Sequence, residues 1–262
     1  MNKRTDSQVY IVCHKPVEYG QWDNALYTPI QVGSKEQFCE LRDNTGDSIA
    51  DWNFLYAEGT AMYWVYRNMP LDTMKYVGFC QYRRRLEFPE DVDFDELFKS
   101  CDIITPEPLN GINPLQQYVH CHSVQDMVDL CAVIAENMPE WIEPFKKYMA
   151  NGTRLWYANS YIMKVEDFKE YACWLFKIFD LLRIKKGWEN PQVAADLIKA
   201  EQENGTRMRD EYSEEGRKAL ADGRSYNAQV FAFLQERLLT MYIQEKFPRV
   251  MEVPYKKYEG LK

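Results

Sequence analysis

The segment that most constrains this chain is Tyr76–Arg85, in which an apolar run leads directly into three arginines. Tyr76–Cys80 holds apolar residues and one glycine, and it is short, so it predicts a buried strand. Buried strands of this kind belong to open α/β sheets, which bind their ligands at the carboxyl ends of the strands. Because Arg83, Arg84 and Arg85 follow the strand, we expect an anion at that edge of the sheet.

The three arginines cannot all reach one ligand if the strand continues, because neighbouring side chains of a strand point to opposite faces. One or two of them suffice to bind a diphosphate through bidentate, charge-assisted hydrogen bonds. The alternative is that they form surface ion pairs with the nearby carboxylates of Glu87, Glu90 and Asp91. The apolar run before them favours the anion site.

The overall charge limits the classes of partner. The 262 residues carry a formal net charge of −8, which disfavours nucleic acid and anionic lipid as general surface partners. Any anion site must therefore be a local concentration of positive charge. The 18 tyrosines and 7 tryptophans suit recognition of a sugar or a base, since a ring face stacks while its polar tip forms a hydrogen bond. An aromatic-rich core is the alternative explanation.

Cysteine usage and hydropathy predict a compartment. The seven cysteines form no Cys-x-x-Cys pair, and an odd number within apolar runs is typical of free thiols in a reducing environment. The first ten residues lack the apolar core of a signal peptide. No apolar run approaches the roughly 20 residues that span a bilayer. These features predict a soluble cytoplasmic protein.

Strand and helix patterns alternate along the chain, which indicates a layered α/β fold, with one domain over residues 1–262 and a mostly helical C-terminal part. The first strand ends in polar residues, as is common at the start of nucleotide-binding domains. Residues 183–224 are charged and poor in aromatics, and they predict a helical insertion or lid. The expected strands are 8–13, 27–33, 75–82, 101–105 and 155–164 (one strand or a pair), and the expected helices are 48–67, 93–99, 124–137, 165–182 and 225–246.

Five further side chains are candidates for chemistry. His14 follows the first strand, where an imidazole can bond a phosphate or a sugar hydroxyl; a structural role is the alternative. Asp43 and Asp47 lie in the polar turn before helix 48–67, where carboxylates suit ribose or sugar hydroxyls, with helix capping as the alternative. Glu58 and Glu236 lie in apolar helices, where a carboxylate is solvated, paired or functional, and either can serve as general base toward a hydroxyl.

Several common motifs are missing. The sequence has no Walker loop, no Gly-x-Gly-x-x-Gly and no Gly-x-Ser-x-Gly elbow. His120-Cys121-His122 lacks the ligand spacing of structural zinc sites, and Asp91-Val92-Asp93 is typical of a loop and helix cap. We therefore expect no metal site in these segments.

Taken in order, the segments resemble a bacterial family of capsular and exopolysaccharide glycosyltransferases long catalogued as a domain of unknown function. The family has a histidine before its Tyr-Arg-Arg hallmark, where this chain has Gln81. If that histidine does acid–base work, the chain has a changed acceptor or reduced activity; if it only bonds a hydroxyl or phosphate, glutamine can replace it. The matching positions are Cys13-His14-Lys15, Pro29–Gly33, Leu41–Ile49, Asn53, Glu58, Thr60, Tyr63, Trp64, Arg67, Asn68, Val77-Gly78, Tyr82-Arg83-Arg84, Asn159–Met163, Tyr171, Trp174–Phe176 and Glu236-Arg237-Leu238.

The resemblance implies a GT-A-like, Rossmann-like nucleotide-diphospho-sugar transferase. Its donor would be a UDP-sugar, with UDP-galactofuranose suggested by some relatives. Its acceptor would be a glycan or lipid-linked glycan of a surface polysaccharide, met through a peripheral contact with the inner face of the membrane. Nucleic acid is not an expected partner.

GT-A enzymes usually hold the donor diphosphate through a divalent metal on an Asp-x-Asp motif at the end of a mid-domain strand. Gln81-Tyr82-Arg83 stands in that place here. We hypothesise that arginines replace the metal, so that no metal or other cofactor is required, with dependence on Mn²⁺ or Mg²⁺ as the alternative. Glu58 or Glu236 would be the base. The expected donor-binding residues are His14, Asp43, Asp47, Asn53, Gln81, Tyr82, Arg83, Arg84 and Asn159.

Two other classes of function stay open on the sequence. Gln81 and the missing Asp-x-Asp fit a non-catalytic, nucleotide-sugar-binding subunit of a polysaccharide assembly complex. An α/β protein that only makes protein contacts is the third reading. Slow hydrolysis of a UDP-sugar by the purified protein counts against the second class, and a nucleotide ligand counts against the third.

Overall fold

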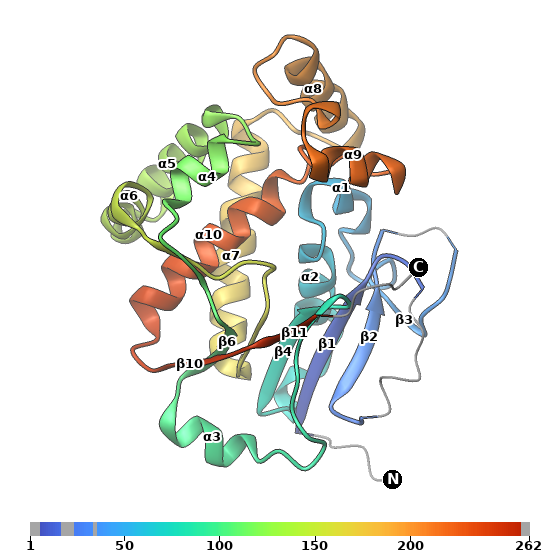
Figure 1. The fold of residues 1–262 in the computed structure, drawn as a ribbon, viewed down its shortest axis with the longest axis vertical. Coiled ribbons are helices and arrows are strands. Elements are labelled where there is room, and N and C mark those ends of the chain that lie inside the picture. Colours follow the sequence, from blue (N-terminus) through green and yellow to red (C-terminus); the bar gives the residue numbers. More distant parts are fainter. Residues whose placement is uncertain (1–5, 17–23, 34–35, 258–262) are drawn as a thin grey trace.

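The computed structural model describes residues 6–16, 24–33 and 36–257. Helices and a central mixed sheet form layers, so the predicted α/β class is confirmed (Figure 1). The sheet has the strand order β10-β6-β9-β4-β1-β2-β3. Residues 1–5, part of the segment that we examined for a signal sequence, lie outside the described residues.

Four parallel strands make up one half of the sheet. They are β1 (Ser7–Cys13), β2 (Tyr27–Gln31), β3 (Leu41–Arg42) and β4 (Tyr76–Gln81). Residues of β1 alternate between two hydrophobic cores, one on each face of the sheet. A strand buried on both faces reads as a continuous apolar run, which is why β1 and β4 were predictable from sequence. Their carboxyl ends meet at one edge.

The other half of the sheet is mixed. Strand β9 (Tyr161–Lys164) runs antiparallel to both β4 and β6 (Ile103–Pro106), and β10 (Val250–Val253) runs parallel to β6. The antiparallel β5 (Arg84–Leu86) and β11 (Tyr255–Lys257) extend β4, while β7 (Leu109–Asn110) and β8 (Arg154–Leu155) form a separate pair. Strands β10 and β11 were not predicted, because both are short and carry exposed charges.

The two faces of the sheet are covered unequally. The larger core includes residues of α2, α7 and α10, whereas α3 contributes Phe94 and Phe98 to the smaller core on the other face. None of the helices in the described chain is long and apolar enough to cross a membrane. The helices are α1 (Asn53–Tyr56), α2 (Gly59–Asn68), α3 (Phe94–Ser100), α4 (Pro114–Val119), α5 (Val124–Asn137), α6 (Ile142–Asn151), α7 (Val165–Lys185), α8 (Pro191–Glu203), α9 (Glu214–Ala221) and α10 (Val230–Lys246).

The single helix expected over 48–67 is wrong: the structure breaks it at Ala57. This residue has a φ of 45°, outside the helical region, and it separates α1 from α2. The Asn53 amide and the Thr60 hydroxyl both donate hydrogen bonds to the Ala57 carbonyl, at 2.8 and 3.1 Å. These side chains compete with the helical hydrogen bonds and stabilise the turn. Glu58 therefore stands at the start of α2 rather than in mid-helix.

The cysteines are free thiols, as expected from their spacing. Four of them are buried, whereas Cys173 is exposed on α7.

The final helix begins later than predicted, at Val230, because residues 225–229 form a turn that leads into α10.

A buried ion cluster attaches the charged segment 183–224 to the rest of the protein. The Asp126 carboxylate on α5 pairs with Arg207 at 3.0 Å and with Lys186 at 2.9 Å, and it accepts a hydrogen bond from the Tyr118 hydroxyl. Glu201 on α8 also pairs with Arg207 at 2.7 Å. The side chains of Asp126 and Arg207 are fully buried. Despite its polar composition, this segment is therefore tied to the core.

We expect Asp126→Asn to lower the free energy of unfolding by about 3–5 kcal/mol, because it leaves buried cations without their shared counter-charge. Asp129→Asn is the matched control, since Asp129 pairs with Lys186 at 3.0 Å but retains partial exposure. Its expected loss is smaller, because Lys186 keeps Asp126 as its counter-charge. Urea denaturation measures both, and equal losses would contradict a dominant role for Asp126.

Candidate functional site

The parallel strands bring several predicted residues to one edge of the sheet. His14 follows the end of β1, and Gln81 is the last residue of β4. Strand β9 runs the opposite way, with Tyr161 opposite Phe79, so the residues just before β9 lie beside the end of β4. This pairing places Asn159 next to Gln81, although 78 residues separate them in the sequence.

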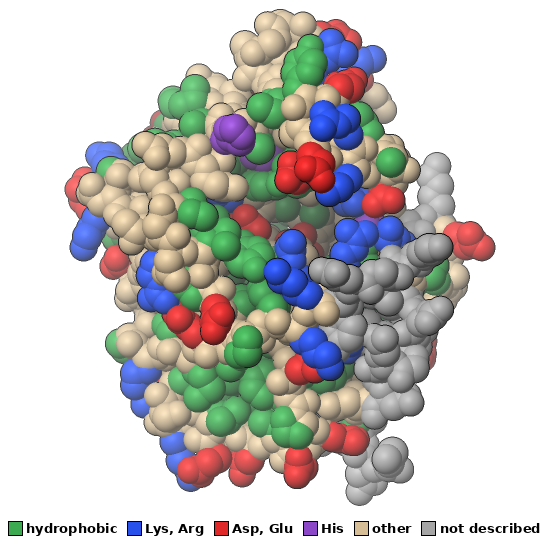
Figure 2. Space-filling model, viewed as in Figure 1, with side chains coloured by type: hydrophobic (Ala, Val, Ile, Leu, Met, Phe, Trp, Pro, Cys, Tyr) green, Lys and Arg blue, Asp and Glu red, His purple; other side chains and the backbone are tan. Residues whose placement is uncertain are grey.

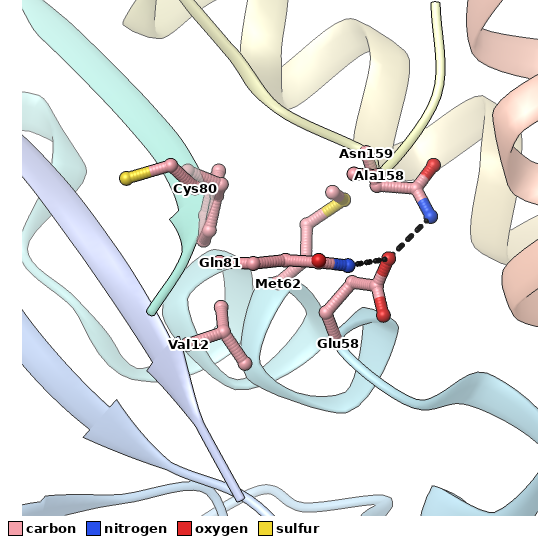
Figure 3. A pocket seen from close by; sticks show the side chains of 8 residues that line it. Val12, Glu58, Met62, Cys80, Gln81, Ala158 and Asn159 are labelled. Atoms are coloured by element: carbon pink, nitrogen blue, oxygen red, sulfur yellow. Dashed lines mark hydrogen bonds between the residues drawn. The ribbon is translucent and has the colours of Figure 1, made fainter. Parts of the chain in front are cut away.

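Glu58 joins these two amides into one cluster. Its Oε1 accepts hydrogen bonds from Asn159 Nδ2 at 2.9 Å and from Gln81 Nε2 at 3.2 Å (Figure 3). Asn159 Nδ2 also donates to the Ala232 carbonyl of α10 at 3.2 Å. Two neutral donors on one oxygen orient the carboxylate while leaving its other oxygen directed away from both amides.

The cluster lines a tight recess in which the side chains leave no room for a water molecule. The Gln81 and Asn159 amides point toward the Glu58 carboxylate (Figure 3), and the other lining residues are apolar. The lining residues are Val12, Glu58, Met62, Phe79, Cys80, Gln81, Ala158 and Asn159.

Unusual backbone conformations are concentrated around Glu58. Within the described residues, the only non-glycine positions with positive φ are Ala57, Ala158 and Asn159, at 45°, 64° and 46°. Ala57 directly precedes Glu58, and the other two form the turn that delivers the Asn159 amide. Each such residue costs of order 1–3 kcal/mol and is kept where its surroundings enforce it, often at functional sites.

Glu236, the second predicted carboxylate, approaches the same turn from α10. Its Oε1 accepts a hydrogen bond from the Ala158 backbone N–H at 2.6 Å, and its Oε2 pairs with Arg237 at 3.1 Å. Burial raises the pKa of the Glu236 carboxyl, Arg237 and the Ala158 N–H lower it, and the charge of Glu58 raises it. The two carboxylates are therefore electrostatic neighbours, but both oxygens of Glu236 are already engaged.

The three arginines of the opening segment do not face one ligand together, because Arg84 and Arg85 lie in a second strand, β5, where neighbouring side chains point to opposite faces. Tyr82 and Arg83 form the turn between β4 and β5, and Arg84 begins β5. The Arg83 and Arg84 guanidinium groups lie over the rings of Tyr82 and Tyr157, at 5.0 and 5.3 Å, and neither has a carboxylate within ion-pair distance in the described part of the chain. Arg85 instead is buried and faces Glu87 at 3.7 Å.

His14 lies in a crowded basic environment at this edge. Its ring meets the Tyr82 ring edge-on, with Nε2 3.4 Å from the Tyr82 hydroxyl. Burial and the charges of Arg224, Arg83 and Lys15 lower the pKa of His14 to about 3, against a smaller raising effect of Asp222. The imidazole is therefore neutral at physiological pH and serves as a hydrogen-bonding group rather than a cation.

The candidate residues in and after the turn before α1 have different roles. Asp43 follows β3 and is buried, and burial raises the pKa of its carboxyl to about 6, against a hydrogen bond with Thr60. Asn53 holds the Ala57 turn, as described above. Asp47 instead accepts hydrogen bonds from Arg67 Nε at 2.7 Å and from the Tyr63 hydroxyl at 3.0 Å on the protein surface. Asp43 and Asn53 support the Glu58 region, whereas Asp47 links the turn to α2.

Gly33, which follows β2, allows Asn53 to reach its position beside the sheet. Its φ is +62°, and a Cβ atom there would lie 2.2 Å from Asn53 Oδ1. Only glycine permits both the left-handed conformation and this close approach. The amide of Asn53 can therefore sit against the end of β2 while it holds Ala57.

Sequence reasoning missed three charged residues at the edge. Lys15 was visible only as the residue after His14, and Asp222 and Arg224 lie in the segment that follows α9. Asp222 pairs with Lys15 at 3.6 Å and with Arg224 at 3.4 Å. No local pattern points from residue 224 to the end of β1, so only the fold could bring them together. Within the described ranges, no three His, Cys, Asp or Glu side chains gather as a metal site.

Comparison with known proteins supports the reading of the fold. The structure matches the apo structure of WbbM, described as a bifunctional glycosyltransferase, with a TM-score of 0.69 and 22% sequence identity. The match covers 97% of this chain and 46% of that one, so the present chain spans less than half of its length. This likeness confirms the predicted GT-A-like α/β fold.

The family can be stated as well. A sequence model described as "Domain of unknown function (DUF4422)" matches residues 8–193. The chain therefore belongs to this family, whose model spans the strands and helices that hold His14, Glu58, Gln81 and Asn159. No curated protein matched the sequence.

The environment of His14 makes a direct prediction. We expect its ring signals in NMR spectra to stay those of a neutral imidazole from about pH 8 down to about pH 5, since its pKa is lowered to about 3. Arg224→Gln removes one of the nearby positive charges and is expected to raise this pKa. A midpoint near the ordinary histidine value of roughly 6.5 in the unmodified protein would contradict the description of the site.

Proposed function

We propose that this protein is a glycosyltransferase that moves a sugar from a nucleotide-diphosphate donor to a glycan acceptor. The observation that carries the proposal is the Glu58–Gln81–Asn159 cluster, which lies beside Arg83 at the carboxyl edge of a GT-A-like sheet. Ligands of open α/β sheets bind at this edge. The name of the WbbM protein, which shares the fold, supports the same chemistry.

The donor diphosphate would bind at the turn after β4. Arg83 and Arg84 have no carboxylate partner in the described residues, so their charges are available to an anion. On the family resemblance, Gln81-Tyr82-Arg83 would occupy the place where an Asp-x-Asp motif usually holds a metal ion. Guanidinium groups held over the Tyr82 and Tyr157 rings can stabilise the charge that develops on the leaving phosphate. We therefore propose transfer without a required metal.

Glu58 is the better candidate for the general base. Gln81 and Asn159 fix one of its oxygens, and the other oxygen is directed away from them. In the proposed step, the acceptor hydroxyl oxygen bonds to the anomeric carbon and its proton passes to Glu58. The bond from that carbon to the phosphate oxygen breaks, and its electron pair leaves with the nucleoside diphosphate. This single displacement inverts the anomeric centre.

Glu236 would then act as a positioning residue. Both of its oxygens are engaged, one by the Ala158 N–H and the other by Arg237. It holds the turn that delivers the Asn159 amide to Glu58.

Gln81 fits the same scheme. Its amide donates a hydrogen bond to Glu58 and needs no titratable proton. A glutamine therefore suffices at the position where the family pattern, as the sequence resemblance implies, has a histidine.

The finer features of the proposal follow from the family resemblance. The donor would be a UDP-sugar, with UDP-galactofuranose as one choice, and the acceptor a glycan or lipid-linked glycan of a surface polysaccharide. The protein would act on them as a peripheral enzyme at the inner face of the membrane. A screen of UDP-, GDP-, dTDP- and CMP-sugars by thermal shift or mass spectrometry identifies the donor.

We expect Arg83→Ala and Arg84→Ala each to weaken donor binding by roughly 10- to 100-fold, the effect of losing a hydrogen bond to a charged phosphate. Calorimetry with UDP-sugars, with and without EDTA, measures this. Arg209→Ala is the control, because Arg209 is exposed and pairs with Glu211 in another part of the protein. Unchanged affinity in both variants, or an absolute need for Mn²⁺ or Mg²⁺, would reject the arginine site.

The base assignment is tested by two carboxylate variants. Glu58→Gln is expected to reduce kcat by about 10²- to 10⁴-fold with little change in donor affinity, because it removes the proton acceptor. Glu236→Gln keeps an oxygen that can accept from Ala158 N–H, so a smaller loss is expected. The reverse order of effects would assign the base to Glu236. Donor binding with neither transfer nor slow hydrolysis would instead indicate a non-catalytic sugar-nucleotide-binding subunit.

A further inference from the structure

Three cations from distant parts of the chain converge on His14. Lys15 is the next residue along the chain, and the Arg83 guanidinium group lies over the Tyr82 ring that His14 contacts edge-on. Arg224, which follows α9, shares Asp222 with Lys15. The charges of all three also lower the pKa of His14. In the space-filling view, this face of the molecule is hollowed near its middle, and Lys and Arg side chains lie along the rim together with Asp and Glu side chains (Figure 2). Positive charge is thus concentrated at one place on a protein with a net charge of −8.

Only one carboxylate is paired with this cluster in the described part of the chain. Asp222 lies 3.6 Å from Lys15 Nζ and 3.4 Å from an Arg224 nitrogen. Both distances exceed the roughly 2.7–2.9 Å of a strong charge-assisted hydrogen bond. The side chains of Lys15 and Asp222 remain 27% and 36% exposed. Ion pairs that are this long and this accessible are weak and are easily replaced.

The Arg224 guanidinium group also has a hydrogen-bond donor that no acceptor satisfies. Its Nε atom is buried and has no hydrogen-bond partner among the described residues. A buried donor without a partner is costly, and native proteins retain such groups mainly where a ligand, ion or water completes them. Its guanidinium group therefore has capacity for a further acceptor beside the one that Asp222 supplies.

We propose that Lys15 and Arg224 join Arg83 in a diphosphate-binding site, and that Asp222 is an internal anion which the diphosphate displaces. This inference rests on the proposed function and names further residues of the same site. Three cations against one carboxylate leave two positive charges uncompensated. The diphosphate of a sugar nucleotide carries two negative charges, so it offers Lys15 and Arg224 more charge than the single carboxylate of Asp222 does, and it can contact Arg83 as well.

The displacement also gives the segment after α9 a role. Asp222 and Arg224 end the charged region 183–224, which Arg207 anchors to the core through Asp126. When Arg224 turns to the phosphate and Asp222 leaves, this end of the segment closes over the donor. After transfer, Asp222 competes again for Lys15 and Arg224 and so favours release of the nucleoside diphosphate.

The test is calorimetry of inorganic pyrophosphate and of UDP, in the presence of EDTA, with the full chain. We expect Lys15→Gln and Arg224→Gln each to weaken both ligands about tenfold or more, as the loss of a charge-assisted contact implies. Asp222→Asn is expected to tighten both ligands several-fold, because the competing anion is gone. Arg209→Gln, in the same charged segment, is the control and should bind both ligands as the unmodified protein does.

The direction of the affinity change in Asp222→Asn distinguishes this proposal from a purely structural role of Asp222. If Asp222 only ties its loop in place, Asp222→Asn will loosen the loop and weaken both ligands, which overturns the proposal. Unchanged affinity in Lys15→Gln and Arg224→Gln, or no pyrophosphate binding at all, overturns it as well. If the expected pattern appears without any sugar transfer, the anion site stands and the glycosyltransferase function fails. If transfer depends on Arg83 and Arg84 but not on Lys15 or Arg224, only the present inference fails.

Discussion

The antiparallel pairing of β9 with β4 is the constraint on which the site depends. With Tyr161 opposite Phe79, the turn before β9 lies beside the end of β4, and Asn159 and Gln81 reach the same oxygen of Glu58. A shift of one residue in this register would turn every side chain of β9 to the other face of the sheet. The left-handed turn at Ala158 and its hydrogen bond to Glu236 are further consequences of this pairing.

The second organising feature is the separation of charge at the sheet edge. Two carboxylates, Glu58 and Glu236, face the Ala158 turn, while Lys15, Arg83 and Arg224 surround His14 nearby. Burial disfavours the charged form of each group, and the neighbouring charges add to this effect, which is why His14 stays neutral and the pKa of the Glu236 carboxyl is raised. A site with an acidic and a basic half can hold an anionic leaving group on one side and accept a proton on the other.

The sequence predictions succeeded where a run of neighbouring residues determines the structure, and they failed where particular hydrogen bonds or distant contacts determine it. Strands β1 and β4 and the position of Gln81 were readable because burial on both faces leaves a continuous apolar run. The helix over 48–67 was predicted as unbroken because its apolar spacing continues through Ala57. What breaks it is a pair of hydrogen bonds from Asn53 and Thr60, which hydrophobic periodicity does not register. Strands β10 and β11 were not predicted because both are short and carry exposed charges, so neither has the apolar run of a buried strand.

By itself, the sequence determined the α/β class, the ends of the buried strands and the residue types available there: an imidazole at His14, an amide at Gln81 and guanidinium groups at Arg83 and Arg84. Local patterns carry this information because strand burial and polarity are properties of neighbouring residues. Only the tertiary structure decided that Glu58 meets Asn159, and that Arg224 and Asp222 stand beside Lys15. Those contacts join segments separated by 101 or more residues, and sheet pairing and helix packing, rather than local propensity, bring them together.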